Sequence, residues 1–117
     1  MDTDDPALAT SDPLLDGSVD PLLIRLADDV VEGAGLLAPE RRLMLGYVWL
    51  KAQRDWLREL ICKNPRIRAL RQESATSLAE LAAAIADLLA AFLHRAAAAT
   101  VAMLLVTIGL ERLCRGL

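Results

Sequence analysis

Apolar residues recur at helical spacing in three stretches of the chain. The first stretch begins at Asp20-Pro21, a dipeptide that can cap a helix and occupy its first turn. It ends at Gly33 and Gly35, because glycine accepts the left-handed conformation that follows a helix C-terminus. The apolar positions between these signals are Leu23, Leu26, Ala27, Val30 and Val31. The pattern predicts a helix over residues 21–32.

The second stretch begins after Pro39 and is stopped by Asn64-Pro65. Its first half, Leu43–Leu50, is apolar on all sides, so we expect neighbouring elements to enclose it. Its second half is amphipathic, which predicts one buried and one solvated face. The helix should run over residues 40–63, and a short basic helix or turn, Arg66–Arg71, should follow it.

The third stretch starts at Ser77, which can form a capping box with Glu80. A single helix from there to Cys114 would be roughly 57 Å long at 1.5 Å per residue. A domain of this size can bury about half of that length. The helix must therefore bend near His94-Arg95, or its second half must leave the domain.

These elements predict an all-α fold, a small helical bundle of three principal helices with a long apolar C-terminal helix and a flexible acidic N-terminus. Residues 1–19 form the acidic lead, residues 20–95 the helical domain, and residues 96–117 the apolar C-terminal helix. The expected core contains Leu23, Leu26, Val30, Leu43, Tyr47, Trp49, Leu50, Trp56, Leu60, Leu81, Ile85, Leu88 and Phe92.

Charge is distributed unevenly along the 117 residues. Residues 1–37 carry nine acidic residues against Arg25 alone, residues 38–73 carry a net charge of +5, and residues 74–117 are balanced. The hydrophobic content of 55% exceeds the roughly 45–50% usual for a soluble protein. The composition excludes a wholly disordered chain and leaves both a tightly oligomeric and a membrane-associated protein open.

Cys62 and Cys114 make no disulfide framework, zinc site or CxxC motif, which favours a reducing compartment. Residues 1–20 are acidic and lack the apolar core of a signal peptide. We therefore expect a cytoplasmic protein, with membrane association as the alternative.

The segment Ala96–Leu110 carries no charge and no polar face. It would form roughly 22 Å of helix, against a hydrocarbon core of about 30 Å. Arg95 and Arg112 flank it, as they would flank a short membrane anchor. Two interpretations stay open, a buried helix of a bundle or oligomer and a weak C-terminal anchor. Alanines recur at four-residue spacing, which favours close helix packing and self-association, at Ala79/Ala83, Ala82/Ala86/Ala90 and Ala98/Ala102.

Four basic residues, Lys63, Arg66, Arg68 and Arg71, can contact an anionic surface. The alternatives are pairing with the acidic lead and a solvated helix face. The sequence pI of about 5.1 argues against nucleic acid as a partner, since such domains usually have a pI above about 9.

The residues Asp87, His94 and Arg95 invite a catalytic interpretation that their spacing does not support. Asp87 and His94 lie two turns apart on one predicted helix, too far for a direct side-chain bond. His94 is the single histidine, and the sequence contains no phosphate-binding loop, nucleophile elbow or metal-ligand motif. We expect no enzyme activity, no cofactor, no metal site and no small-molecule substrate.

The segment Leu23–Val30, with Leu26 and a small residue before Asp28, resembles the BH3 segment of apoptosis regulators. The resemblance covers about eight residues and implies a helix that docks into a hydrophobic groove of a partner. The chain has no recognisable BH1 or BH2 segment, and Pro21 places Val19, the expected first apolar anchor, outside the helix.

The pattern as a whole predicts a non-enzymatic interaction or scaffold protein that self-associates or binds another helical protein through its C-terminal helix. The alternative is a membrane-anchored protein, held through residues 96–110, whose cytosolic helices recruit a partner. The predicted assembly positions are Leu81, Ile85, Leu88, Phe92, Val101, Leu104, Leu105 and Ile108.

Overall fold

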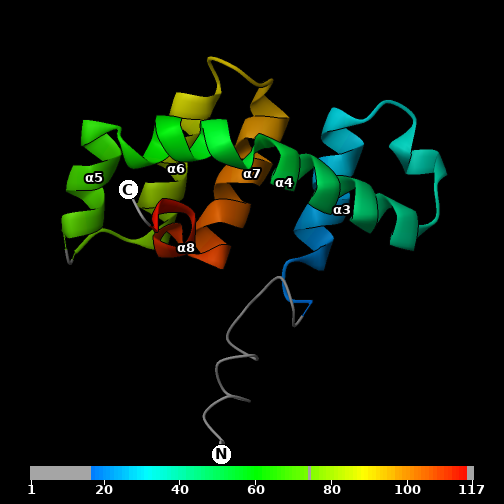
Figure 1. Ribbon diagram of the computed structural model, residues 1–117, viewed down its shortest axis with the longest axis horizontal. Coiled ribbons are helices and arrows are strands. Elements are labelled where there is room, and N and C mark those ends of the chain that lie inside the picture. The colour runs from blue at the N-terminus through cyan, green and yellow to red at the C-terminus, as the bar shows by residue number, and fades with distance from the viewer. Residues whose placement is uncertain (1–16, 74, 116–117) are drawn as a thin grey trace, which may run out of the picture.

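The computed structural model describes residues 17–73 and 75–115, and in these residues it is all-helical (Figure 1). Residues 1–16, most of the predicted acidic lead, lie outside the described part of the chain. The elements in order are α3 (Asp20–Val30), η1 (Ala34–Leu36), α4 (Pro39–Cys62), α5 (Pro65–Gln72), α6 (Leu78–Leu89), α7 (Arg95–Ile108) and α8 (Leu110–Cys114).

Helix α4 is the longest element and crosses the molecule from α3 to α5 (Figure 1). Its first half packs against α3, and its second half lies beside α8. The contact with α3 is very close at Gly46, because a Cβ atom built there would lie 2.0 Å from the backbone oxygen of Leu23. Arg42 also joins the two helices, donating from Nε to Asp28 Oδ1 at 3.0 Å. Gly46 is thus the point at which the two helix backbones meet.

Helix α3 begins one residue earlier than predicted and uses no side-chain cap. Val19 occupies the N-cap position, and Asp20 is the first helical residue. Val19 is fully buried, so the core begins inside the segment that the sequence assigned to the acidic lead. The helix ends at Val30, two residues before the predicted end, with Val31 as an extended C-cap. Gly33, predicted to end the helix, has a φ of 80° and lies in the turn that leads to η1.

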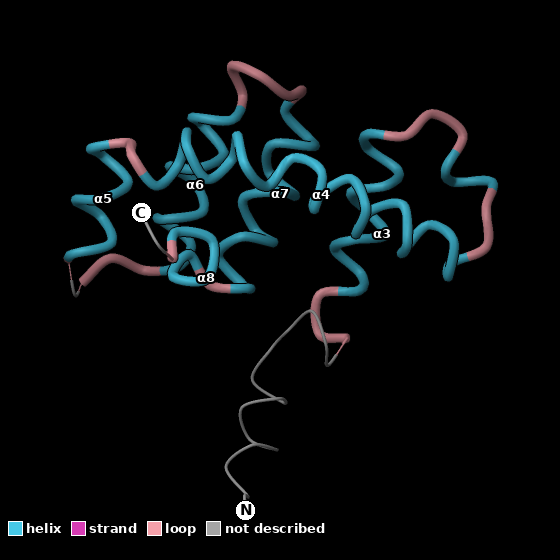
Figure 2. The backbone as a smooth tube through the Cα atoms, viewed as in Figure 1, coloured by secondary structure: helices cyan, strands magenta, loops and turns pink. Residues whose placement is uncertain are grey.

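The single long C-terminal helix is not confirmed. The chain leaves helical geometry after Leu89, makes a short loop, and starts α7 at Arg95 with His94 as its N-cap (Figure 2). The bend near His94-Arg95 is therefore the correct one of the two predicted alternatives. Folding back lets α7 pack against both α6 and α3, which buries its apolar surface within the chain.

The capping box at the start of α6 is confirmed. Ser77 Oγ accepts the Glu80 N–H at 3.1 Å, and Glu80 Oε1 accepts the Ser77 N–H at 3.2 Å. We expect Ser77→Ala to lower the free energy of unfolding by about 1 kcal/mol, because two N–H groups lose this reciprocal arrangement. Urea unfolding measures the change, and Ser77→Asp, which keeps an acceptor, should recover most of it. Equal losses in both variants would contradict a capping role.

The core combines side chains from every long helix. Its largest fully buried members include Leu26 of α3, Leu57 and Ile61 of α4, Ile85 and Leu89 of α6, and Leu104 of α7. Most predicted core positions are buried or half-buried, but two predictions are wrong. Tyr47 is 39% exposed and Phe92 is 60% exposed, because Tyr47 lies on the outward side of α4 and Phe92 lies in the loop after α6.

A turn at Gly109 separates α7 from α8. Its φ of 111° is strained for residues with a side chain, so glycine allows the chain to turn here without strain. Leu110 returns to the core, and Cys114 forms a disulfide bond with Cys62 at the end of α4. The prediction that these cysteines make no disulfide framework is therefore wrong. Arg58 of α4 also donates a hydrogen bond to the backbone oxygen of Arg115.

Candidate functional site

The basic stretch after α4 is a two-turn helix, α5, held against the rest of the molecule by Ile67. Asn64 caps it, with Oδ1 accepting the Ile67 N–H at 3.1 Å, and Pro65 occupies the first turn. Ile67 is 1% exposed, whereas Arg68 and Arg71 are exposed. The cap, the buried Ile67 and the half-buried Leu70, which also packs against the core, fix the direction in which the arginines project.

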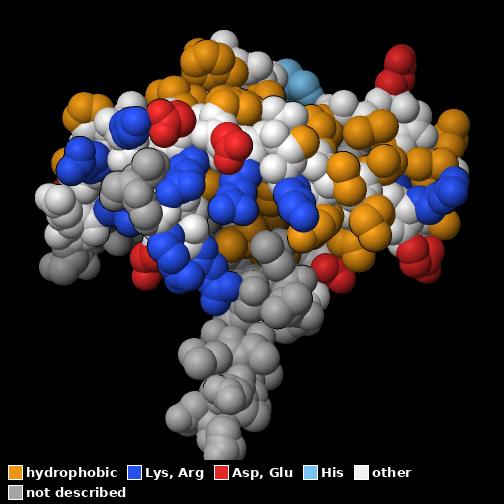
Figure 3. Space-filling model, viewed as in Figure 1, with side chains coloured by type: hydrophobic (Ala, Val, Ile, Leu, Met, Phe, Trp, Pro, Cys, Tyr) orange, Lys and Arg blue, Asp and Glu red, His pale blue; other side chains and the backbone are white. Residues whose placement is uncertain are grey.

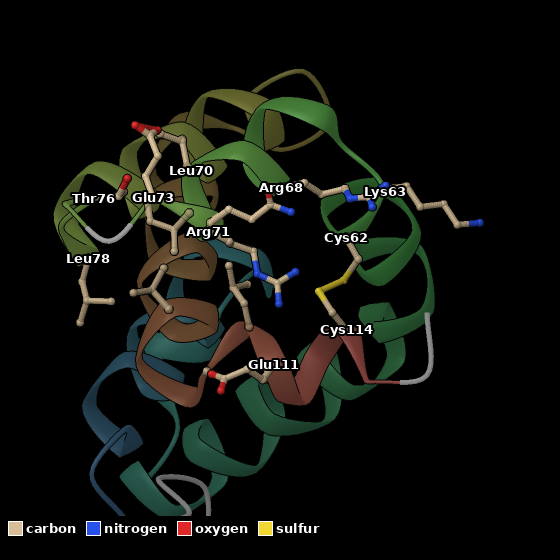
Figure 4. Close-up of a pocket in the computed structure, with 15 residues that line it drawn as sticks. Cys62, Lys63, Arg68, Leu70, Arg71, Glu73, Thr76, Leu78, Glu111 and Cys114 are labelled. Carbon is tan, nitrogen blue, oxygen red and sulfur yellow. A yellow bond between two sulfur atoms is a disulfide. The ribbon is translucent and has the colours of Figure 1, made fainter.

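A pocket of about 850 Å³ lies between α5, the end of α4, the start of α6 and the α7–α8 turn (Figure 4). Its cationic lining comes from Lys63, Arg68 and Arg71. Its apolar lining consists of Leu70, Leu78, Leu81, Val106 and Leu110. The Cys62–Cys114 disulfide forms part of the wall, so the bond joins two sides of the pocket.

The arginines in this pocket have unused hydrogen-bonding capacity. Within the described residues, neither Arg68 nor Arg71 makes an ion pair, whereas Lys63 Nζ lies 2.8 Å from Glu59 Oε1. Glu73 and Glu111 also border the pocket but are not paired with either arginine. Figure 4 shows the Arg71 guanidinium projecting into the space between the disulfide and the leucine side chains. The pocket therefore offers two free guanidinium groups.

The structure brings together three of the four basic residues predicted to contact an anionic surface. Lys63, Arg68 and Arg71 line the pocket, and Arg66 does not. Arg68 and Arg71 are three residues apart and share a face of α5. Arg66 precedes Arg68 by two residues, a spacing that places it on a different face of the helix. Thr76, Leu78 and Glu111 of the lining were not predicted, because they come from elements that only the tertiary fold places here.

The predicted assembly residues lie mostly inside the chain's own core. Ile85, Val101, Leu104 and Leu105 are buried there, and Phe92 is the exposed exception. Leu81, Leu88 and Ile108 are partly buried and pack against the same core. The apolar surface of residues 96–110 is thus largely covered by α3 and α6.

The outward side of α4 carries the exposed apolar side chains that the sequence placed in the interior. Met44 is 60% exposed and Val48 is 52% exposed, and with Tyr47 they follow the spacing of a helix face. The exposed charges of Glu40 and Lys51 lie at the two ends of this row. We call these five residues the α4 stripe. Figure 3 shows hydrophobic side chains gathered over the first half of α4, with Lys and Arg over its second half and α8.

His94 contacts Asp29, not Asp87 or Arg95. Its Nε2–H donates to the Asp29 backbone oxygen at 2.7 Å, which leaves Nδ1 to accept the Ala97 N–H at 3.4 Å. Thr100 Oγ1 donates to Asp29 Oδ2 at 3.1 Å from a position that is 3% exposed. These bonds join α3 to α7. Both nitrogens of His94 serve this structural contact, so the cluster resembles a helix cap more than a reactive site.

The segment that resembles BH3 turns its apolar face inward. Leu23, Leu26 and Ala27 are buried within the α3–α4–α7 packing. Docking of this face into a partner's groove would require α3 to leave the core.

The described residues contain no group of three or more side chains suited to hold a metal ion. In the same part of the chain, no helix has both the length and the apolar content needed to cross a membrane. Comparison of the chain with protein families, curated proteins and solved structures gave no match.

Proposed function

We propose that this protein is a non-enzymatic helical interaction protein that self-associates through the α4 stripe. The observation that carries the proposal is the exposed row Met44, Tyr47 and Val48 on a helix whose opposite side is packed in the core. Adjacent apolar side chains at this spacing are the contact pattern of paired helices. A second copy of the chain is the partner that fits the charges beside the row.

The charges favour an antiparallel arrangement of two α4 helices. A twofold axis between Leu45 and Gly46 places Glu40 opposite Lys51 of the second copy, and Met44 opposite its Tyr47. Twofold symmetry repeats each contact, giving two ion pairs that flank two apolar pairs. A parallel arrangement would place each charged residue opposite its own copy. The charge pattern thus selects both register and direction.

Self-association through the α4 stripe differs from the sequence-based prediction, which placed the contact in the C-terminal helix. The apolar positions of α7 are largely used in the chain's own core, so their use in assembly would require the core to open. The α4 stripe is accessible without any rearrangement. The membrane-anchored alternative depends on the same apolar segment, most of whose large side chains pack in the chain's own core.

Sedimentation equilibrium of charge-reversal variants tests the proposal. One helix face is a small contact, so we expect a weak dimer whose population rises with protein concentration. Glu40→Lys and Lys51→Glu should each weaken dimerisation about tenfold, because each creates two like-charge contacts. The double variant Glu40→Lys/Lys51→Glu should restore it.

Matched controls separate the stripe from net charge. Asp87→Lys and Arg66→Glu make the same changes in charge at exposed positions away from the stripe. They should leave dimerisation unchanged, with circular dichroism confirming that every variant is folded. A protein that is monomeric at all accessible concentrations, or a double variant no better than the single ones, would overturn the proposal.

A further inference from the structure

The pocket between α5 and α8 has two chemically different sides. Arg68 and Arg71 supply guanidinium groups on the α5 side, and the opposite wall comes from side chains of α6, α7 and α8, namely Leu78, Leu81, Val106 and Leu110. Leu78, the first residue of α6, lies at this wall and is 66% exposed. A bound apolar group would cover its side chain. A ligand that satisfies both sides must carry an anionic head and an apolar body.

We infer that this pocket binds a small amphiphilic anion, a carboxylate attached to a hydrocarbon chain. Guanidinium groups match carboxylate oxygens in geometry, and a charged hydrogen bond is stronger than a neutral one. The carboxylate lies against Arg68 and Arg71, and the hydrocarbon chain extends along Leu78, Leu81 and Val106. The volume of about 850 Å³ is in the range of pockets that enclose small organic molecules.

The remaining charges of the lining fit this assignment. Lys63 forms an ion pair with Glu59, so the two arginines, which are unpaired within the described residues, supply the electrostatic attraction for the carboxylate head group. Glu73 and Glu111 at the border offset two of the three positive charges of the lining, which leaves a net charge of +1. The lining therefore favours one carboxylate over a diacid or a polyanion, and its apolar wall disfavours a fully polar anion.

Isothermal titration calorimetry with three probes tests each half of the inference. Octanoate carries both parts of the ligand, acetate carries the head alone, and 1-octanol carries the hydrocarbon chain alone. Octanoate should bind at least tenfold more tightly than either of the others, and its affinity should fall as salt is added. Absence of octanoate binding, or equal affinity for acetate, would overturn the inference.

Variants locate the binding in this pocket. Arg71→Gln should weaken octanoate binding about tenfold, since it removes a charged hydrogen bond. Leu78→Ser should weaken it several-fold by removing apolar contact. Arg66→Gln is the matched control, because Arg66 lies on the same helix outside the pocket. Unchanged binding by Arg71→Gln, or equal loss in Arg66→Gln, would contradict the assignment.

This site is independent of the α4 stripe. None of the five stripe residues lines the pocket. The Arg71→Gln variant should therefore keep the dimerisation of the unmodified chain, and failure of either proposal leaves the other standing.

Discussion

Replacing Gly46 by alanine is expected to destabilise the protein by about 3 kcal/mol. The added Cβ would lie 2.0 Å from the oxygen and 2.8 Å from the carbonyl carbon of Leu23, both of which are backbone atoms. No rotamer change can relieve this overlap, so α3 and α4 must separate and loosen the core around Leu26 and Leu50. The cost outweighs the gain of about 1 kcal/mol that alanine brings to a helix interior.

Urea unfolding of the Gly46→Ala variant measures the change in the free energy of unfolding. The sign of that change shows whether the two helix backbones are in contact. Without the close contact, helix propensity alone would make the variant more stable than the original chain. Gly35→Ala is the matched control, because a Cβ there meets nothing within 4 Å. The control should stay within about 0.5 kcal/mol of the original. A stabilised Gly46→Ala protein would show that the helices are not in backbone contact.

Reduction of the Cys62–Cys114 bond is expected to produce the second large loss of stability. The bond closes a loop with a sequence separation of 52 residues. Loop-closure entropy assigns about 4 kcal/mol to a cross-link of this span. Helix α8 should be the first element to detach, because it has five residues and Leu110 is the one residue of the helix that is buried.

Thermal unfolding with and without reductant measures the effect. The Cys62→Ser/Cys114→Ser variant should unfold at the temperature of the reduced protein and should not respond to reductant. Hydrogen exchange should show the largest loss of protection in α8. Identical unfolding of the oxidised and reduced chains would mean that the bond contributes nothing to stability.

The sequence predicted the features of the fold that depend on local chemistry. Asn64-Pro65 ends one helix and caps the next, and Ser77 starts α6 with its capping box. These signals act over three or four residues, so they can be recognised without knowledge of the tertiary structure.

The break between α6 and α7 could not be predicted from local signals alone. Residues Ala90–Leu93 include neither proline nor glycine, and alanine and leucine favour helix. Burial of α7 against α3 and α6 and the contact of His94 with Asp29 stabilise the turn instead. Tyr47 and Phe92 were misplaced for a related reason, since hydrophobicity indicates which residues favour burial but not which faces find a partner.

The candidate site was only partly predictable. The cluster of basic residues is visible in the sequence, and the helical spacing of Arg68 and Arg71 is enough to place them on one face. The wall opposite the arginines comes from residues between 78 and 114, which only the tertiary fold brings to α5. The two cysteines of the pocket wall lie 52 positions apart in the sequence. Two cysteines can be bonded or free at that separation, and the packing of α8 on α4 is what brings them together.

The most direct test of self-association through α4 mixes the two single variants, each of which should dimerise about tenfold more weakly than the original chain. In the proposed register, Glu40→Lys chains place lysine opposite lysine, and Lys51→Glu chains place glutamate opposite glutamate. One chain of each kind restores both opposite-charge contacts. At a concentration at which the original chain is largely dimeric, sedimentation velocity should therefore show a lower average mass for each variant alone and recovery of the dimer in the equimolar mixture. A mixture that stays monomeric, or single variants that dimerise as well as the original chain, would contradict the account.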